Sequence, residues 1–404
     1  MRPFIQTAAV LALLLARSLF GTSRHDVPTR EAPIVRFIVK HPWMVAAGLT
    51  AVVMTGALLG IVSGVMPIKA SSGHWWMTAA MLDFAKVRSV ATHSLGIDAP
   101  GLDDPALVIR GASHYESGCN PCHGGPGGGV PPVMAAMTPP PPELSGRIAS
   151  WTPEELFSIV KHGIKFTGMP AWPVQQRDDE VWAVVAFLRT MPRLDAAGYR
   201  RLAYGDPSTE PNAALNLSPV PRQQPPRAVR DVCWRCHGVD GAGRGPGAFP
   251  SLAGQRATYL YASLRAFADR NRFSGIMSAV TSTLSDQAMR DAAEHYERQP
   301  SRSAAQPTDE AAMARGAAIA TRGMPERNVP SCADCHGPTD NARNPSYPVI
   351  AGQHPGYLAL QLELLRERRR GGSPYVNLMH VFVDRLSPEA IRDVTLYYST
   401  LPQE

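Results

Sequence analysis

The chain has 404 residues, a length that favours two to four domains. Its formal net charge is +6, from 40 Lys and Arg against 34 Asp and Glu. Six of those basic residues and only two of the acidic ones lie in residues 1–42, so the rest of the chain is nearly neutral and gives no indication of a nucleic-acid partner.

The N-terminal region begins with a short apolar run, Phe4 to Ala16, which ends at Arg17. A run of this length is typical of the hydrophobic part of a signal peptide or of a helix that lies on a membrane surface. We expect residues 1–42 to form a cytoplasmic or interfacial segment. If the run were a signal peptide and were removed, the next apolar helix would return the domains after it to the cytoplasm.

A stretch of 24 uncharged residues, 43–66, lies between Pro42 and Pro67. At about 1.5 Å per residue it is long enough to cross a hydrocarbon core of about 30 Å, and it is apolar on all sides, unlike a core helix. The sequence therefore predicts one transmembrane helix. More basic residues precede it than follow it, which places the N-terminus in the cytoplasm and the later residues in the periplasm.

Residues 67–104 are predicted to form a periplasmic stalk. They contain the pair Trp75 and Trp76, residue types that favour the membrane–water interface. The apolar spacing between His74 and His93 predicts a helix, and we expect these two histidines to be solvated or hydrogen-bonded.

The six cysteines form three Cys-x-x-Cys pairs, and a histidine follows each pair directly. The motifs are Cys119-Asn120-Pro121-Cys122-His123, Cys233-Trp234-Arg235-Cys236-His237 and Cys332-Ala333-Asp334-Cys335-His336. Since 12 of 404 residues are histidine, the chance of this triple coincidence is roughly three in a hundred thousand. A zinc site would pair two such motifs and a thioredoxin-like site needs no histidine, so three covalent haem c groups are the favoured interpretation. Such attachment occurs outside the bacterial cytoplasm, which agrees with the predicted orientation.

Three haem modules are predicted after the stalk. They are domain 1 at 105–194, a linker at 195–226, domain 2 at 227–300, a linker at 301–307 and domain 3 at 308–404. The last two modules form an internal repeat, since Pro250 to Gln255 recurs as Pro348 to Gln353 with an offset of 98. A fainter version of the pattern begins at Pro142 in the first module.

The histidine of each motif, His123, His237 or His336, is the expected proximal iron ligand, which leaves one coordination position for each iron. A methionine there would favour electron transfer, although any single methionine could simply fill a core. The repeat pairs Met277 with Met379, whereas the rival Met289 corresponds to Ile391. Met169, in the turn Gly168-Met169-Pro170-Ala171-Trp172, is expected at the first iron in preference to the nearer Met134 and Met137.

Three prolines and one basic run complete the candidate features. The carbonyls of Pro142, Pro250 and Pro348 are expected to accept the second N–H of the proximal histidines, with ordinary turn prolines as the alternative. The run Arg366 to Arg370 is expected to be a solvated face. Contact with an acidic partner or with haem propionates is the alternative.

These motifs resemble class I cytochromes c, and residues 227–404 resemble the tandem dihaem cytochromes of the c-four type. The resemblance implies all-α class I cytochrome c domains, with the second and third facing one another. With the predicted membrane helix, the expected fold is three such domains in tandem after one N-terminal transmembrane helix. The membrane anchor and the added third module depart from the soluble dihaem pattern. The second module departs from the family pattern because it has little sequence before Cys233, so its leading helix is short or missing.

The leading functional hypothesis is a periplasmic electron carrier that passes electrons towards a terminal oxidase. The alternative is the cytochrome subunit of a periplasmic dehydrogenase, of the alcohol or gluconate type. A haem enzyme with an open iron would lack at least one methionine ligand. We expect no catalytic residues, no small-molecule substrate and no nucleic-acid partner, only redox partner proteins and the membrane.

Overall fold

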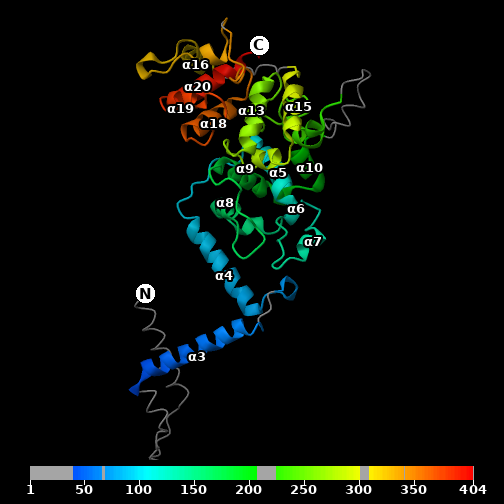
Figure 1. Cartoon of the computed structure of the whole chain (residues 1–404), viewed down its shortest axis with the longest axis vertical. Helices are drawn as coiled ribbons and strands as arrows, with labels where there is room; N and C mark the ends of the chain where they lie inside the picture. Colours follow the sequence, from blue (N-terminus) through cyan, green and yellow to red (C-terminus); the bar gives the residue numbers. More distant parts are fainter. Residues whose placement is uncertain (1–39, 66–68, 207–223, 301–308, 341, 404) are drawn as a thin grey trace, which may run out of the picture. The chain divides into compact units, whose positions relative to one another are not determined.

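The structure is a computed structural model that describes residues 40–65, 69–206, 224–300, 309–340 and 342–403 (Figure 1). Within these ranges the chain is helical, and β-structure is limited to two isolated bridges. The predicted all-α class is confirmed. The predicted linker 301–307, and all but the last three residues of the segment 1–42, lie outside the described residues.

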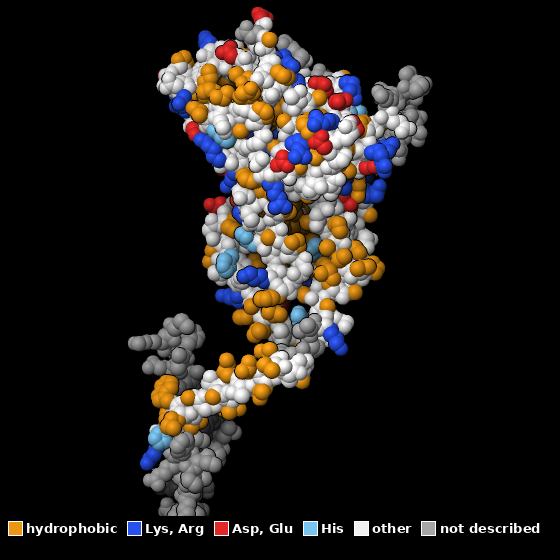
Figure 2. Space-filling model, in the orientation of Figure 1, with side chains coloured by type: hydrophobic (Ala, Val, Ile, Leu, Met, Phe, Trp, Pro, Cys, Tyr) orange, Lys and Arg blue, Asp and Glu red, His pale blue; other side chains and the backbone are white. Residues whose placement is uncertain are grey.

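Residues 1–72 and 73–404 form two separate compact units, and the first contains helix α3 (Pro42–Val62). This helix has a mean hydropathy of 2.2 and no buried residue, and Figure 2 shows apolar side chains along its length. No other helix in the described residues is long and apolar enough to cross a membrane. The helix starts one residue before the predicted span 43–66 and ends four residues before its end, ahead of Gly64 with φ +68°.

The second unit begins with α4 (Trp76–His93), which confirms a helix in the predicted stalk and contacts the first group of helices. That group comprises α5 (Pro105–Gly118), α6 (Asn120–His123), α7 (Pro132–Ala135), η2 (Ile148–Ser150), α8 (Pro153–His162), α9 (Asp178–Thr190) and η3 (Met191–Arg193). Helix α5 crosses α9 at Gly111, where an added Cβ would lie 1.8 Å from the carbonyl oxygen of Ala183. A glycine is therefore needed for this close helix contact.

The predicted linker 195–226 is wrong in its first part, because α10 (Ala196–Tyr204) lies there. The Asp195 side chain accepts the Gly198 amide and caps the helix, and Tyr199 and Ala203 are buried in the first core. Only these two positions are fully buried in nine residues, so the apolar spacing was too sparse to indicate a helix. Residues 207–223 lie outside the described part.

The second and third groups have closely similar helices. The second comprises η5 (Val229–Cys233), α12 (Trp234–His237), α13 (Ala257–Ala268), α14 (Met277–Thr281) and α15 (Asp286–Glu297). The third comprises α16 (Glu310–Arg322), η6 (Pro325–Arg327), α17 (Ala333–His336), α18 (Pro355–Arg366), α19 (Val376–Val383) and α20 (Pro388–Thr400). In the third group α16 crosses α20 at Gly316, in the same way as α5 crosses α9 in the first. The second group has no such leading helix, and the single turn η5 takes its place.

The second and third groups face one another through paired hydrogen bonds that reflect the internal repeat. Gln353 accepts the amide of Ser251 at 3.0 Å and donates to its carbonyl at 2.9 Å. Gln255 makes the same two bonds with Val349, at 2.8 and 2.6 Å. Gln255 and Gln353 are equivalent in the repeat, as are Ser251 and Val349, so the interface has approximate two-fold symmetry.

The glycine crossing gives a first prediction. Gly316→Ala places a Cβ 2.1 Å from the Asp393 carbonyl oxygen and forces α16 away from α20. We expect the free energy of unfolding to fall by about 1–3 kcal/mol, the usual penalty of overpacking. Denaturant unfolding of the haem-loaded protein measures it. Gly356→Ala, in α18 with no atom within 4 Å, is the matched control, and equal effects of the two variants would contradict the crossing.

The two-fold interface gives a second prediction. Gln353→Ala leaves the buried amide and carbonyl of Ser251 without this partner, which we expect to lower the free energy of unfolding by about 1–3 kcal/mol. Gln255→Ala should have a similar effect by symmetry, whereas the exposed Gln287→Ala should not. Limited proteolysis and denaturant unfolding measure the change, and unchanged stability in both buried variants would argue against the interface.

Candidate haem sites

Each Cys-x-x-Cys-His motif forms a single helical turn that gathers its three reactive side chains. Helices α6, α12 and α17 begin directly after the first cysteine and end at the histidine. The amide of His123 donates to the Cys119 carbonyl at 2.9 Å, and that of His336 donates to Cys332 at 2.9 Å. In each motif the two cysteines and the histidine are residues i, i+3 and i+4, which a helical turn places on one face. Both sulfurs and the imidazole can therefore bind the same group.

A glycine with positive φ ends each of these turns, and a buried tyrosine holds it. The glycines follow each histidine directly and have φ values of 70°, 76° and 78°; they are Gly124, Gly238 and Gly337. Their carbonyls accept the hydroxyls of Tyr115, Tyr296 and Tyr398 at 2.6, 3.0 and 2.9 Å. These glycines are not among the predicted site residues, although the string Cys-His-Gly, common to all three motifs, indicates them.

The histidine rings are oriented by proline carbonyls. The Nδ1 atoms of His123, His237 and His336 lie 3.0, 3.2 and 3.0 Å from the carbonyl oxygens of Pro142, Pro250 and Pro348. A carbonyl can only accept, so Nδ1 carries the proton and Nε2 keeps its lone pair for a metal. The predicted proline–histidine hydrogen bonds are confirmed at all three motifs.

The second motif opens into an apolar cavity that also contains the predicted methionine. Cys233, Cys236, His237 and Met277 all line this cavity. Met289 is only 2% exposed and lies outside the lining, in agreement with its exclusion by the repeat. The structure thus brings one histidine, one methionine thioether and two cysteines to the lining of one cavity.

The third motif has the same arrangement. Cys332, Cys335, His336 and Met379 line a second apolar cavity, which also includes Tyr347 and Phe382. Burial lowers the pKa of His336, and burial likewise lowers the pKa of His237, against the opposing effect of their proline hydrogen bonds. The lowered pKa values favour the neutral imidazole, the form that binds a metal.

The first motif has two methionines near its predicted ligand turn. The Met169 carbonyl accepts the Ile164 amide at 3.2 Å, and the Met169 amide donates to the Thr167 hydroxyl at 3.1 Å. The Met137 methyl group also lies at this turn, since a Cβ on Gly168 would be 2.3 Å from it. The structure brings both Met169 and Met137 to the turn.

The cysteines do not have the properties of a redox dithiol or of a zinc site. Burial raises the pKa of Cys119 and of Cys233 to about 12, and that of Cys332 to about 11, whereas reactive Cys-x-x-Cys pairs have lowered values. None of the six cysteines forms a disulfide. The described residues contain no group of three His, Cys, Asp or Glu side chains that could hold a metal ion. Thioether attachment to a porphyrin fits this chemistry better than either alternative.

The first helical group covers the second motif, which has no leading helix of its own. Ala106 and Ile109 of α5 pack on Ala248 and Phe249, in a cluster that also touches Cys236. Arg110 and His114 lie one and two helical turns after Ala106, and both line the same cavity as His237. The missing helix before Cys233 is thus replaced by a helix from the preceding module.

The basic run at the end of α18 differs from the expected solvated face. Arg370 donates to the Tyr259 hydroxyl at 2.7 Å, and Arg369 donates to the Gln176 carbonyl at 2.7 Å. Both arginines also line the cavity of the second motif. Arg368 alone faces solvent among these three, in an ion pair with Asp384. The run contacts the first and second modules instead of forming one exposed patch.

Comparison with known proteins agrees with this geometry. Residues 106–188 match the family described as cytochrome c oxidase, cbb3-type, subunit III, and residues 227–300 match the family cytochrome c. The chain is 36% identical over 174 residues to the thiosulfate dehydrogenase electron acceptor of Stutzerimonas stutzeri, covering 43% of this chain and 80% of that protein. It is 33% identical to cytochrome c4 of Thiocapsa roseopersicina, covering 43% and 88%.

A solved structure is also similar. The reduced recombinant cytochrome c4 from Pseudomonas stutzeri is 28% identical, with 45% of this chain and 100% of that chain covered and a TM-score of 0.40. The sequence relatives cover most of their own length on this chain, and the matched domains are haem-binding electron carriers by family. The chain therefore belongs to the cytochromes c, and its relatives include the dihaem proteins of the c4 type.

Proposed function

We propose that this chain is a membrane-anchored, periplasmic cytochrome c with three covalent haems, which relays electrons towards a terminal oxidase. The observation that carries the proposal is the convergence of a histidine, two cysteines and a downstream methionine on one apolar cavity, twice in the chain. The same histidine–proline hydrogen bond at the first motif supports a third site of this kind.

Each site would hold its haem through two thioethers and two iron ligands. The thioethers would come from Cys119 with Cys122, Cys233 with Cys236, and Cys332 with Cys335. The iron ligands would be His123 with Met169, His237 with Met277, and His336 with Met379. Haem iron with histidine and methionine ligands supplies a one-electron carrier of raised reduction potential.

The chain contributes three further properties to electron transfer. The proline carbonyls fix each imidazole in one tautomer and orientation, so little rearrangement accompanies a change of charge. The walls around Met277 and Met379 are mostly apolar, which lowers the local polarity at their sulfurs. The paired glutamine hydrogen bonds keep the second and third modules at a constant separation.

The membrane and the partner are inferred from separate observations. The exposed apolar helix α3 supports an anchor, and haem attachment outside the cytoplasm supports a periplasmic location for residues after it. The match of residues 106–188 to a subunit of cbb3-type oxidases supports a terminal oxidase as electron acceptor.

A second candidate is the electron-accepting subunit of a periplasmic dehydrogenase. Two relatives, from Stutzerimonas stutzeri and Thiomonas intermedia, are described as thiosulfate dehydrogenase electron acceptors, at 36% and 32% identity. Such a role would use the same three sites and differ only in the electron donor.

The axial ligands give a third prediction. Met277→Ala and Met379→Ala should each remove one third of the methionine-to-iron charge-transfer band of the oxidised protein, because each deletes one of three sulfur ligands. Met169→Ala should remove the last third, and Met137→Ala should leave it. A denaturing gel stained for haem should show unchanged haem content in every variant. Loss of one third of the band in Met137→Ala, with no loss in Met169→Ala, would show that Met137 is the ligand of the first iron instead.

The partners give a fourth prediction. The reduced full chain in membranes should be reoxidised rapidly when a cbb3-type oxidase and oxygen are present, and slowly when the oxidase is inhibited by cyanide. A chain with Cys332→Ala and Cys335→Ala is the control for damage to one haem site. Rapid reduction by thiosulfate and thiosulfate dehydrogenase, with no oxidase-dependent reoxidation, would favour the dehydrogenase subunit instead.

A further inference from the structure

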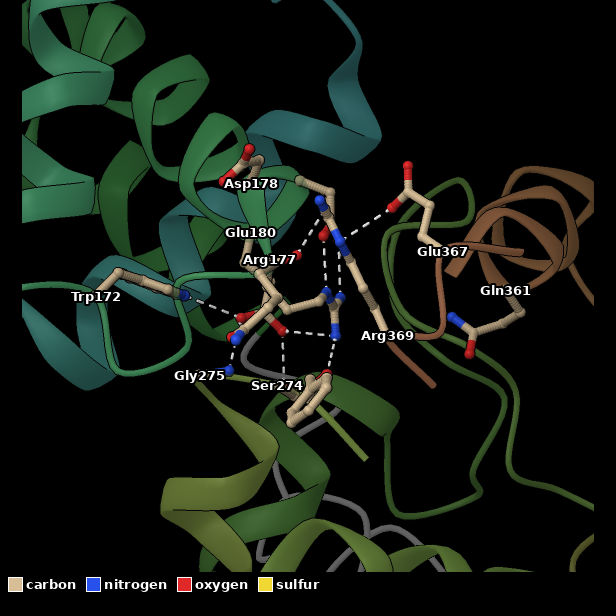
Figure 3. A network of polar contacts seen from close by, with 12 residues as sticks. Trp172, Arg177, Asp178, Glu180, Ser274, Gly275, Gln361, Glu367 and Arg369 are labelled. Atoms are coloured by element: carbon tan, nitrogen blue, oxygen red, sulfur yellow. Dashed lines mark hydrogen bonds and ion pairs between the residues drawn. The ribbon is translucent and has the colours of Figure 1, made fainter. Parts of the chain in front are cut away.

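One buried carboxylate lies where the first module meets the second. Glu180 is the third residue of α9, and only 3% of its surface is exposed. Figure 3 shows its carboxylate between residues of the first module, Trp172 and Arg177, and residues of the second, Ser274 and Gly275. A buried carboxylate requires compensating donors, since an unpaired one would be strongly destabilising.

Four donors from two modules satisfy this carboxylate. Oε1 accepts the Ser274 hydroxyl at 2.6 Å and lies 3.1 Å from the Arg177 guanidinium. Oε2 accepts the Gly275 amide at 2.7 Å and the Trp172 indole N–H at 3.1 Å. All four groups contact the same side chain, so removing Glu180 would delete a hydrogen-bond acceptor from each of them at once.

Three of these four donors, Trp172, Ser274 and Gly275, belong to the loops that carry the predicted iron ligands. Trp172 lies three residues after Met169, in the same Gly-Met-Pro-Ala-Trp turn. Ser274 lies three residues before Met277, and its hydroxyl accepts the Met277 amide at 3.0 Å. A chain of hydrogen bonds therefore runs from the first ligand turn through Glu180 to the amide of the second ligand.

The contact leaves no room for a side chain at Gly275. A Cβ there would lie 2.5 Å from the Trp172 indole nitrogen and 3.1 Å from Glu180 Oε2. Next to it, Ile276 packs against the hydrophobic core of the first module. The two loops thus meet through both polar and apolar contacts.

Arg177 extends the same junction. Its guanidinium binds both oxygens of Asp179, at 2.7 and 2.8 Å, and donates to the Phe273 carbonyl at 2.5 Å. Phe273 precedes Ser274, so this arginine fixes the same loop from the other side. The one guanidinium of Arg177 is thus shared between the carboxylates of Asp179 and Glu180.

The third module provides an internal comparison. By the repeat, Leu378 corresponds to Ile276 and Val376 corresponds to Ser274. Leu378 is 47% exposed, and Val376 has no hydroxyl to accept the Met379 amide. The loop of Met379 therefore has no equivalent of the Glu180 contact.

We propose that Glu180 is a positioning residue that fixes the Met169 turn and the Met277 loop against each other, and so couples the first two iron sites. The inference rests on the proposed function, in which these methionines are axial ligands. It assigns to the first module a second role, that of holding a ligand of the second haem. The third site, with Met379, is independent of this residue.

The test uses the full chain with its haems and the variants Glu180→Ala, Glu180→Gln and Ser274→Ala. The oxidised methionine charge-transfer band is recorded with the reduction potential of each haem. We expect Glu180→Ala to weaken the band by up to two thirds and to shift two of the three potentials. Glu180→Gln, which keeps an acceptor oxygen, should have a smaller effect, and Ser274→Ala should shift only the potential of the second haem.

Two sets of controls separate the inference from the proposed function. Glu389→Gln, an exposed carboxylate in the first turn of the equivalent helix α20, should leave all three potentials unchanged. Met169→Ala and Met277→Ala calibrate the band. If these methionine variants leave the band intact, the proposed ligands are wrong; if they reduce it while Glu180→Ala and Ser274→Ala do not, the positioning role is wrong. A helical circular dichroism spectrum like that of the unmodified chain confirms that each variant folds.

Discussion

The hydrogen bond from each motif histidine to a proline carbonyl is the interaction on which the rest of the structure depends. It fixes the imidazole proton on Nδ1 at His123, His237 and His336, so that Nε2 keeps its lone pair for a metal. At His237 and His336 the ring also lines an apolar cavity. The residue after two of these prolines, Ser251 or Val349, is held by a glutamine of the facing module. The orientation of each imidazole is thus connected directly to the packing between modules.

The modules complete one another in different ways. The second and third form an approximately two-fold pair in which each supplies a glutamine to the other. The first is not part of that symmetry. Its helix α5 packs over the second motif, and its Glu180 accepts a hydrogen bond from Ser274 in the Met277 loop. The second module, which has only the turn η5 before its cysteines, is therefore enclosed by its neighbours on two sides.

The sequence predicted the repeated helical modules and the proline–histidine hydrogen bonds, because each is a local or periodic pattern. It also singled out Met277, which lines the cavity of the second motif, over Met289, which does not. The choice of iron ligands stays a prediction. The sequence did not predict α10, whose buried positions Tyr199 and Ala203 are too few to produce a periodic signal. Nor did it predict the roles of Glu180 and Arg369. Each of these residues acts on a partner about a hundred or more positions away, and the charge of a side chain gives no indication of such a partner.

The central claim is that three irons are held between a histidine and a methionine. Near-infrared magnetic circular dichroism of the oxidised, purified chain, combined with haem quantification, tests it most directly. The account predicts three covalent haems per chain, all low-spin, each with a methionine-to-iron charge-transfer signal. A haem count below three, or one high-spin iron without that signal, would contradict it.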